Sequence, residues 1–232
     1  MMPTRRHDPR HATCHRRRWL RLAAGGLLAS LLAGCASLLG GGDNGDRPTM
    51  YAPDPRITLD PSLPQVTWQL ALGATSSSRT VDSYRIAVRP SPDELQVYRN
   101  AGWARTPGDM LQSTLLRGLE DSGKIAAVAR QGAGIAADYR LLLDVRRFEA
   151  DYAGQAVPAA TIEFNAKLIH GADQAIVASR TFLQVQPAAG TELPQVVDAF
   201  SRALEVVGGE LAGWVLVSGE THERQAHPAT VR

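Results

Sequence analysis

The chain contains very little cysteine. Two cysteines occur among 232 residues, Cys14 before an apolar run and Cys35 directly after it. Removal of the segment that ends at Gly34, with modification of Cys35, would leave no free thiol. The remaining domain would then have no disulfide, no thiolate metal site and no cysteine nucleophile. An oxidising compartment is still allowed, because such a compartment permits disulfides without requiring them.

Excess positive charge is also missing once the N-terminal segment is set aside. Residues 1–34 hold seven arginines and one aspartate; without them the basic side chains fall from 25 to 18 and the acidic ones from 23 to 22, a net charge of −4. No basic patch remains that would favour nucleic acid. The remaining length is suited to one domain with its own core.

The motifs of common active sites are absent as well. There is no Gly-x-Ser-x-Gly elbow, and the glycines at 40–42 have no predicted strand before them or helix after them, so they form no phosphate loop. His170 lies beside a predicted turn, where a Ser-His-Asp arrangement is conceivable but a surface histidine is far more common. His222 and His227 fall in a polar segment that we expect to be disordered. With no His-x-x-x-His pair on a predicted helix, we predict no enzyme activity, no cofactor and no metal site.

What the chain does have is a secretory signal of a particular kind. Four arginines precede an apolar run over residues 22–32, which is too short to span a bilayer core comfortably. The run ends in Leu32, Ala33, Gly34 and Cys35, which resembles the bacterial lipobox. The resemblance implies cleavage between Gly34 and Cys35 and acyl chains on the Cys35 sulfur. Two or three chains give firm membrane anchoring, whereas one gives marginal binding.

The residue after the cysteine refines the predicted location. An aspartate at this place resembles an inner-membrane retention signal, and the chain has Ala36 instead. We therefore expect the outer membrane, on its periplasmic face. The arginines at 16–18 also resemble a twin-arginine export motif, although we favour an ordinary basic n-region as their explanation.

The chain after Cys35 divides into a tether, one domain and a tail. Residues 35–64 are rich in Gly, Asp and Pro and predict a flexible tether, in which Met50 and Tyr51 could dock as an edge strand. Residues 65–217 predict the folded domain, and residues 218–232 a disordered tail. Residues 1–34 are the predicted signal peptide.

Alternating apolar residues predict the strands of this domain. We expect short strands near residues 66–72, 84–89, 95–98 and 125–129, and then three longer ones over 139–148, 161–168 and 176–185. The close spacing of the last three suggests an antiparallel meander. Arg146 and Arg147 shift the alternation of their strand, so we place a β-bulge there on the solvent face.

Two helices complete the predicted domain. Thr106 and Pro107 are typical of a helix start, and Gly123 of its end. The second helix carries an apolar stripe from Val197 to Trp214, and Gly208–Gly209 in its middle indicates close packing or a bend. The predicted fold class is α+β, an antiparallel sheet with both helices packed on one face.

In this order the elements resemble a known family, the auxiliary lipoproteins of ABC-type transport systems that contain MCE proteins, of the PqiC type. The resembling segments are residues 98–107, 115–128, 137–149 and 197–214, and Pro90-Ser91-Pro92 is a departure within residues 83–94. The resemblance implies a non-enzymatic protein at the outer membrane that receives the far end of a periplasmic lipid conduit, and it implies an MCE protein as partner. It also implies assembly into a homo-oligomeric ring.

Four residues form a candidate partner-binding patch before the first helix: Tyr98, Arg99, Trp103 and Arg105. Aromatic rings beside arginines are typical of interface anchors. The alternative is that both rings pack at the junction of sheet and helix, since aromatic residues dominate cores as well. Trp68 and Trp214 are expected in the core. A structural adaptor for outer-membrane β-barrel assembly stays open as an alternative function.

Overall fold

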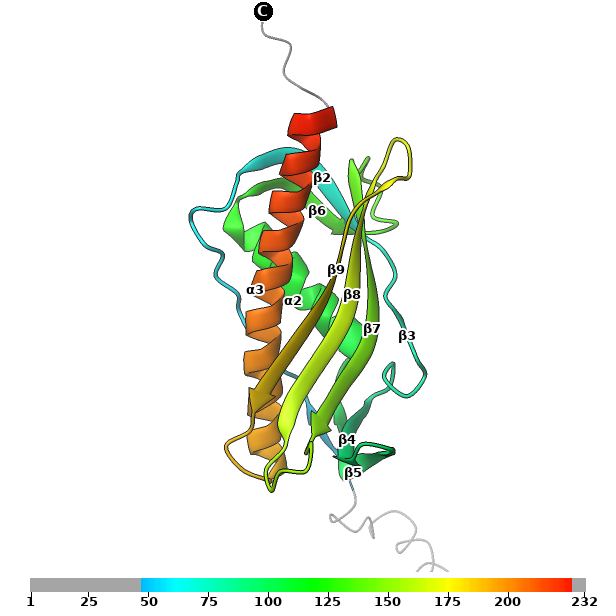
Figure 1. The fold of residues 1–232 in the computed structure, drawn as a ribbon, viewed down its shortest axis with the longest axis vertical. Helices are drawn as coiled ribbons and strands as arrows, with labels where there is room; N and C mark the ends of the chain where they lie inside the picture. The colour runs from blue at the N-terminus through cyan, green and yellow to red at the C-terminus, as the bar shows by residue number, and fades with distance from the viewer. Residues whose placement is uncertain (1–46, 227–232) are drawn as a thin grey trace, which may run out of the picture. The chain divides into compact units, whose positions relative to one another are not determined.

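The computed structural model describes residues 47–226 (Figure 1). The predicted signal peptide, Cys35 and the first part of the predicted tether, up to residue 46, lie outside the described residues, as does the end of the predicted tail. The elements described below lie in the compact unit Pro48–Arg232.

Nine strands and two helices make up this unit, and the predicted α+β class is confirmed. The elements in chain order are β1 (Thr49–Tyr51), β2 (Val66–Leu72), β3 (Ser76–Ser77), β4 (Arg85–Ser91), β5 (Glu94–Trp103), α2 (Pro107–Ser122), β6 (Ile125–Arg130), β7 (Tyr139–Asp151), β8 (Ala159–His170), β9 (Ile176–Pro187) and α3 (Leu193–Ala226). Met50 and Tyr51 belong to β1, which pairs with β5 as an edge strand.

The sheet is mixed, whereas the sequence predicted an antiparallel one. The meander β7–β8–β9 and the hairpin β4–β5 are antiparallel as expected. Strand β7 pairs in parallel with β2, β3 and β4 in succession along one edge, and β6 pairs in parallel with β2. Parallel pairs need a long crossover, and the α2 segment between β5 and β6 supplies one. Alternation of side chains reports burial and carries no information on strand direction, so this pairing was missed.

A β-bulge interrupts β7 where the two arginines predicted it. The pairing register with β8 shifts between Val145 and Arg147. On one side of the shift Leu143 and Val145 face the core, and on the other side Phe148 and Ala150 do so. The extra residue therefore keeps apolar side chains inward along the whole strand.

Helix α2 begins and ends at the residues that the sequence predicted. The Thr106 hydroxyl accepts a hydrogen bond from the Asp109 backbone N–H at 3.4 Å, and Pro107 occupies the first turn. Gly123 ends the helix in the left-handed region, with φ of 62°. The buried stripe consists of Met110, Leu111, Leu115 and Leu119.

Helix α3 is longer than predicted and runs over 34 residues to Ala226. Residues 218–226 are thus helical, and the prediction of a disordered tail from residue 218 was wrong for them. The apolar stripe continues past residue 217 to Gly219, where a Cβ atom would lie 2.4 Å from Cζ2 of Trp68. Polar composition concealed this last stretch, because its contacts are made by a glycine and by polar side chains. Among residues 47–226, neither helix has the length and apolar character needed to cross a membrane.

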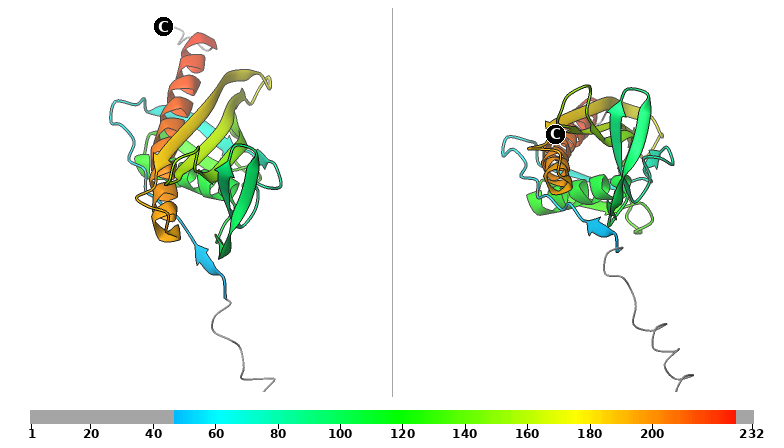
Figure 2. Two further views of the ribbon diagram at one scale, coloured as in Figure 1. Left: turned by 60° about the horizontal axis from the view of Figure 1, so that its bottom comes forward. Right: turned by 90° about the horizontal axis from the view of Figure 1, so that it is seen from below.

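Both helices lie on the concave side of the bent sheet, in contact with each other (Figures 1 and 2). The core between them contains stacked and edge-on aromatic rings. Phe200 of α3 stacks on Phe148 of β7 with ring centroids 4.8 Å apart, and Trp103 of β5 meets both rings edge-on. Trp68 and Tyr139 meet edge-on nearer the C-terminal end of α3, and Trp68 is in the core as predicted.

Candidate functional site

The four residues of the predicted patch do not form one surface. Trp103 is fully buried in the aromatic core, so the packing interpretation holds for it. Tyr98 is half-buried, and burial followed by the neighbouring Tyr152 raises the pKa of its phenol to about 12. Arg105 forms an ion pair with Asp54 at 3.0 Å. Arg99 alone remains an exposed cation on β5.

Exposed apolar side chains also occur along this strand and its neighbours, and the sequence did not single them out. Four large side chains on or beside strands β1, β4 and β5 are each at least one-third exposed: Met50 and Tyr84 beside the end of β5, and Leu95 and Val97 near its start. We call these four residues the β5 surface. Leu95, Val97 and Arg99 alternate along β5, so they project to the same side of the strand. This surface can bind an apolar partner segment next to a positive charge.

The segment between β1 and β2 is held against the helices instead of hanging free. We call residues 54–63 the strap. Asp54 accepts hydrogen bonds from the Arg117 guanidinium at 2.6 Å and from Arg105 at 3.0 Å. The Arg117 hydrogen bond, helped by Arg105, holds the pKa of the Asp54 carboxyl below its ordinary value against the opposing effect of partial burial. The strap is thereby fixed to α2 at its first residue.

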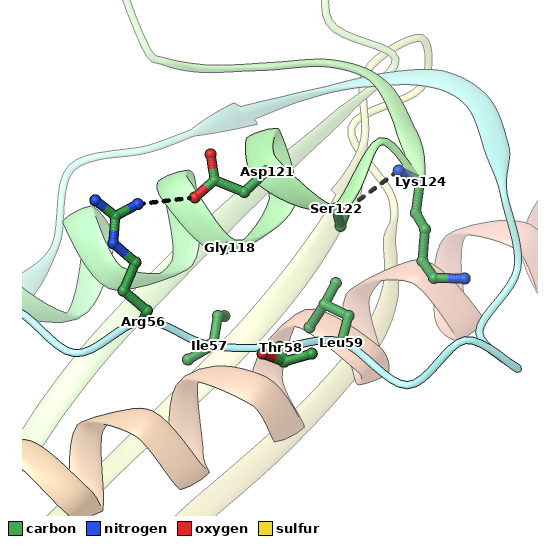
Figure 3. A pocket seen from close by; sticks show the side chains of 8 residues that line it. All are labelled: Arg56, Ile57, Thr58, Leu59, Gly118, Asp121, Ser122 and Lys124. Atoms are coloured by element: carbon green, nitrogen blue, oxygen red, sulfur yellow. Dashed lines mark hydrogen bonds and ion pairs between the residues drawn. The ribbon is translucent and has the colours of Figure 1, made fainter.

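The Ile57 side chain packs between α2 and α3 and holds the strap there (Figure 3). A Cβ atom added to Gly118 of α2 would lie 2.0 Å from Cδ1 of Ile57. A Cβ atom on Gly208 of α3 would lie 3.4 Å from Cγ2 of the same side chain and 3.0 Å from Cγ2 of Thr114. The glycines therefore leave the space that Ile57 fills, and the close packing predicted for the glycine pair is confirmed at Gly208.

Two open hollows border the strap. The first, of about 410 Å³, lies against the end of α2 and is the one drawn in Figure 3. The second, of about 480 Å³, lies against α3. In the first hollow Asp121 forms an ion pair with Arg56 at 3.2 Å, and Lys124 donates from Nζ to the Leu63 carbonyl at 2.7 Å. Its charged groups are thus engaged in holding the strap, and neither hollow brings a nucleophile beside a base.

A polar cluster forms where α3 ends, and it joins residues that are far apart in the chain. The buried Tyr139 phenol donates to Oε1 of Glu223 at 2.7 Å and lies 2.7 Å from Nδ1 of His222. The His170 and His222 ring centroids are 4.9 Å apart, and Nδ1 of His170 lies 3.0 Å from Oδ1 of Asp173. Burial, followed by Glu223, raises the pKa of the Tyr139 phenol well above its usual range, so the phenol stays protonated and acts as a donor.

This cluster removes the argument that the sequence offered against a metal at His222. That argument placed His222 in a disordered tail, whereas the residue lies in α3. One ligand atom from each of His170, His222 and Glu223 can be chosen so that all three lie within 4.8 Å of one another. The periodic stripe of α3, extended by one more turn through Gly219, is the sequence signal that would have placed His222 and Glu223 on a helix.

A second charged cluster lies near the bulge of β7. Glu149, almost fully buried, accepts hydrogen bonds from Nε of Arg89 at 2.8 Å and from Nε of Arg147 at 2.7 Å. The Glu149 carboxylate raises the pKa of the Arg89 guanidinium. Two arginines around one carboxylate satisfy the buried charge, so this cluster serves to hold β4 beside β7.

Comparison with known proteins gives a consistent result. A family model described as the ABC-type transport auxiliary lipoprotein component matches residues 49–212. The crystal structure of protein XCC0632 from Xanthomonas campestris is 54% identical, covers 76% of this chain and 99% of that one, and superposes with a TM-score of 0.74. A further crystal structure of an uncharacterized protein, 16% identical over 72% of this chain and 97% of that one, shows the same fold with a TM-score of 0.56.

One curated relative is an uncharacterized protein of Bradyrhizobium diazoefficiens, bll6063. It is 26% identical over 198 residues, which are 83% of this chain and 51% of that protein. The chain therefore spans about half the length of the curated relative it matches.

Proposed function

The chain belongs to the family of ABC-type transport auxiliary lipoprotein components, and we propose that it is a non-enzymatic outer-membrane lipoprotein of an MCE-type system. In this role it holds the periplasmic lipid conduit at the outer membrane and binds the MCE-domain protein. The β5 surface is the observation that carries the proposal, because it offers a partner exposed apolar side chains beside a cation.

Anchoring follows from the sequence around Cys35. Cleavage after Gly34 and acylation of Cys35 attach the chain to the periplasmic face of the membrane. Thirteen residues, 36–48, then lead to β1. At the reach of an extended chain they span at most roughly 45 Å. Because β1 pairs with β5, the same length limits how far from the membrane the β5 surface can meet its partner.

A binding role without catalysis fits the described hollows. Those beside the strap are open, and the charged side chains in the first of them hold the strap in place. Catalysis would need a nucleophile or a general base placed at a concave site with a pKa suited to its task. The lipid carried by the system would be moved by the ATPase and permease of the inner membrane.

Assembly into a homo-oligomeric ring is part of the proposal, and β9 is the strand suited to it. Within residues 47–226, β9 pairs only with β8, so its other edge has unpaired backbone groups. Ile176, Leu183 and Val185 are more than half exposed along it. An exposed apolar edge strand is a common site of pairing with another chain.

Site-specific photocrosslinking in cells tests the partner. We expect a photoreactive residue at Val97 to crosslink the MCE-domain protein, and the same residue at Val217 of α3, which is similarly exposed, to give no such product. Crosslinks from Val97 to a β-barrel assembly protein would favour the adaptor function instead. Absence of any MCE crosslink from Val97 or Leu95 would overturn the proposal.

A further inference from the structure

We propose that His170, His222 and Glu223 bind one zinc ion at the C-terminal end of α3. The three residues come from two distant parts of the chain: His170 ends β8, and the other two lie in the last turns of α3. One ligand atom can be chosen from each residue so that all three lie within 4.8 Å of one another. This site is separate from the β5 surface and does not depend on the function proposed above.

The hydrogen bonds at Nδ1 of the two histidines fit the tautomers that a metal requires. The Tyr139 hydroxyl has one proton, which it donates to the Glu223 carboxylate. The phenol oxygen then accepts from Nδ1–H of His222, 2.7 Å away, and the lone pair of that ring is on Nε2. Asp173 accepts from Nδ1 of His170 in the same way, so its lone pair is also on Nε2.

A ligating histidine usually donates from its far nitrogen to an oxygen acceptor, most often a carboxylate, a backbone carbonyl or water. Here Asp173 is the acceptor for the far nitrogen of His170, and the Tyr139 hydroxyl is the acceptor for that of His222. Asp173 also accepts a hydrogen bond from the Ala175 backbone N–H at 3.0 Å, and this bond orients its carboxylate toward His170.

The donor set favours zinc. Two imidazole nitrogens and one carboxylate oxygen are a known set for tetrahedral Zn²⁺, with water as the fourth ligand. Ligand bonds of about 2.1 Å in a tetrahedron put the ligand atoms about 3.4 Å apart. The side chains therefore need to close by about 1 Å or somewhat more. His222 and Glu223 are partly exposed and can make this movement by small rotamer changes.

The position on the helix adds to the case. The C-terminal end of a helix carries a partial negative charge and stabilises a nearby cation. Zinc bound here would connect the last turns of α3 to the turn between β8 and β9. The same ion would cover the phenol end of Tyr139, whose ring packs on Trp68. The ion would thus act as a clamp on the end of α3.

Zinc titration of the full-length lipidated protein in detergent tests the proposal. The protein is stripped with a chelator and titrated with zinc against a chromophoric competitor, and bound metal is counted by elemental analysis. We expect one zinc per chain and an affinity at least about 100-fold lower in His170→Gln and His222→Gln. Calcium and magnesium should not compete, because they prefer oxygen ligands.

Glu220→Gln is the matched control for Glu223→Gln, because Glu220 lies one turn earlier on α3 and forms an ion pair with Arg224. The control should bind zinc like the wild type, and Glu223→Gln should bind it more weakly. Asp173→Asn, which removes no ligand, should weaken binding about 10-fold to 100-fold. X-ray absorption should show two imidazoles in the first shell. Equal affinity in the wild type and in both histidine variants, or no retained zinc, would overturn the proposal.

Discussion

The packing of the strap against α2 gives a testable prediction. Whether Gly118→Ala stabilises or destabilises the protein should depend on one neighbouring side chain, that of Ile57. In Gly118→Ala the new Cβ atom would lie 2.0 Å from Cδ1 and 2.1 Å from Cγ1 of Ile57. Real Cβ atoms do not approach so closely, so Ile57 must leave its place between the helices. Overpacking of this kind costs about 1–3 kcal/mol. Alanine also gains about 1 kcal/mol over glycine inside a helix, which leaves a net loss of about 0–2 kcal/mol.

Ile57→Ala removes the atoms that clash, so the effect of Gly118→Ala should change sign. In this background the substitution should stabilise the protein by about 1 kcal/mol, because only the helix propensity of alanine remains. The coupling free energy between the two positions should therefore be about 1–3 kcal/mol. Urea unfolding of the wild type, the two single variants and the double variant, followed by far-ultraviolet circular dichroism, measures it.

Gly209→Ala is the control for this cycle. Gly209 also lies inside a helix, but nothing is within 4 Å of a Cβ atom placed there. It should stabilise the protein by about 0.5–1 kcal/mol whether or not Ile57 is present. If Gly118→Ala stabilises the wild-type protein as much as Gly209→Ala does, Ile57 does not occupy the space between the helices and the reasoning fails.

Four further predictions concern the anchor and the polar clusters. Cys35→Ala should move the protein from the membrane to the soluble fraction, and mass spectrometry of the wild type should find an acylated Cys35; an unmodified thiol there would refute the anchor. Tyr139→Phe removes the hydroxyl and should lower the free energy of unfolding by about 1–2 kcal/mol in urea. Glu149→Gln leaves two arginines without their carboxylate and should cost about 1–3 kcal/mol, so a neutral result would contradict its buried role. The pKa of Asp54 is lowered in the folded state, so the stability that its carboxylate contributes is present above the ordinary carboxyl pKa and is lost as the pH falls through the lowered value. Asp54→Asn should therefore lower the free energy of unfolding by less than about 1 kcal/mol at neutral pH. The free energy of unfolding of this variant should also fall less steeply in acid than that of the wild type.

Local signals predicted the local structure well. The caps of α2 depend on the chemistry of Thr106, Pro107 and Gly123, which acts within a few residues of each. The bulge in β7 follows from a change in alternation that is visible in the sequence itself. These features need no knowledge of the rest of the chain, because the physical cause lies beside the effect.

Features that depend on distant partners were missed. Met50 and Tyr51 dock as the edge strand that the sequence allowed, but the rest of the predicted tether up to residue 64 was not expected to dock, and the strap packs between the helices. A segment rich in proline lacks periodicity, yet a single isoleucine seated against two glycines and an aspartate between two arginines hold it. The cluster of His170, His222 and Glu223 was missed for the same reason, since its members are brought together only by the fold.

The positions of β1 and the strap indicate how the domain would resist a pull on the segment that precedes them. The described chain first forms β1 on β5 and then passes between α2 and α3. A pull on the tether would therefore act first on the β1–β5 pairing, and the Asp54 ion pairs and Ile57 would resist it next. A partner bound at the β5 surface would add contacts to the same strands. Partner binding would then oppose such a pull, because it holds β1 in place beside β5.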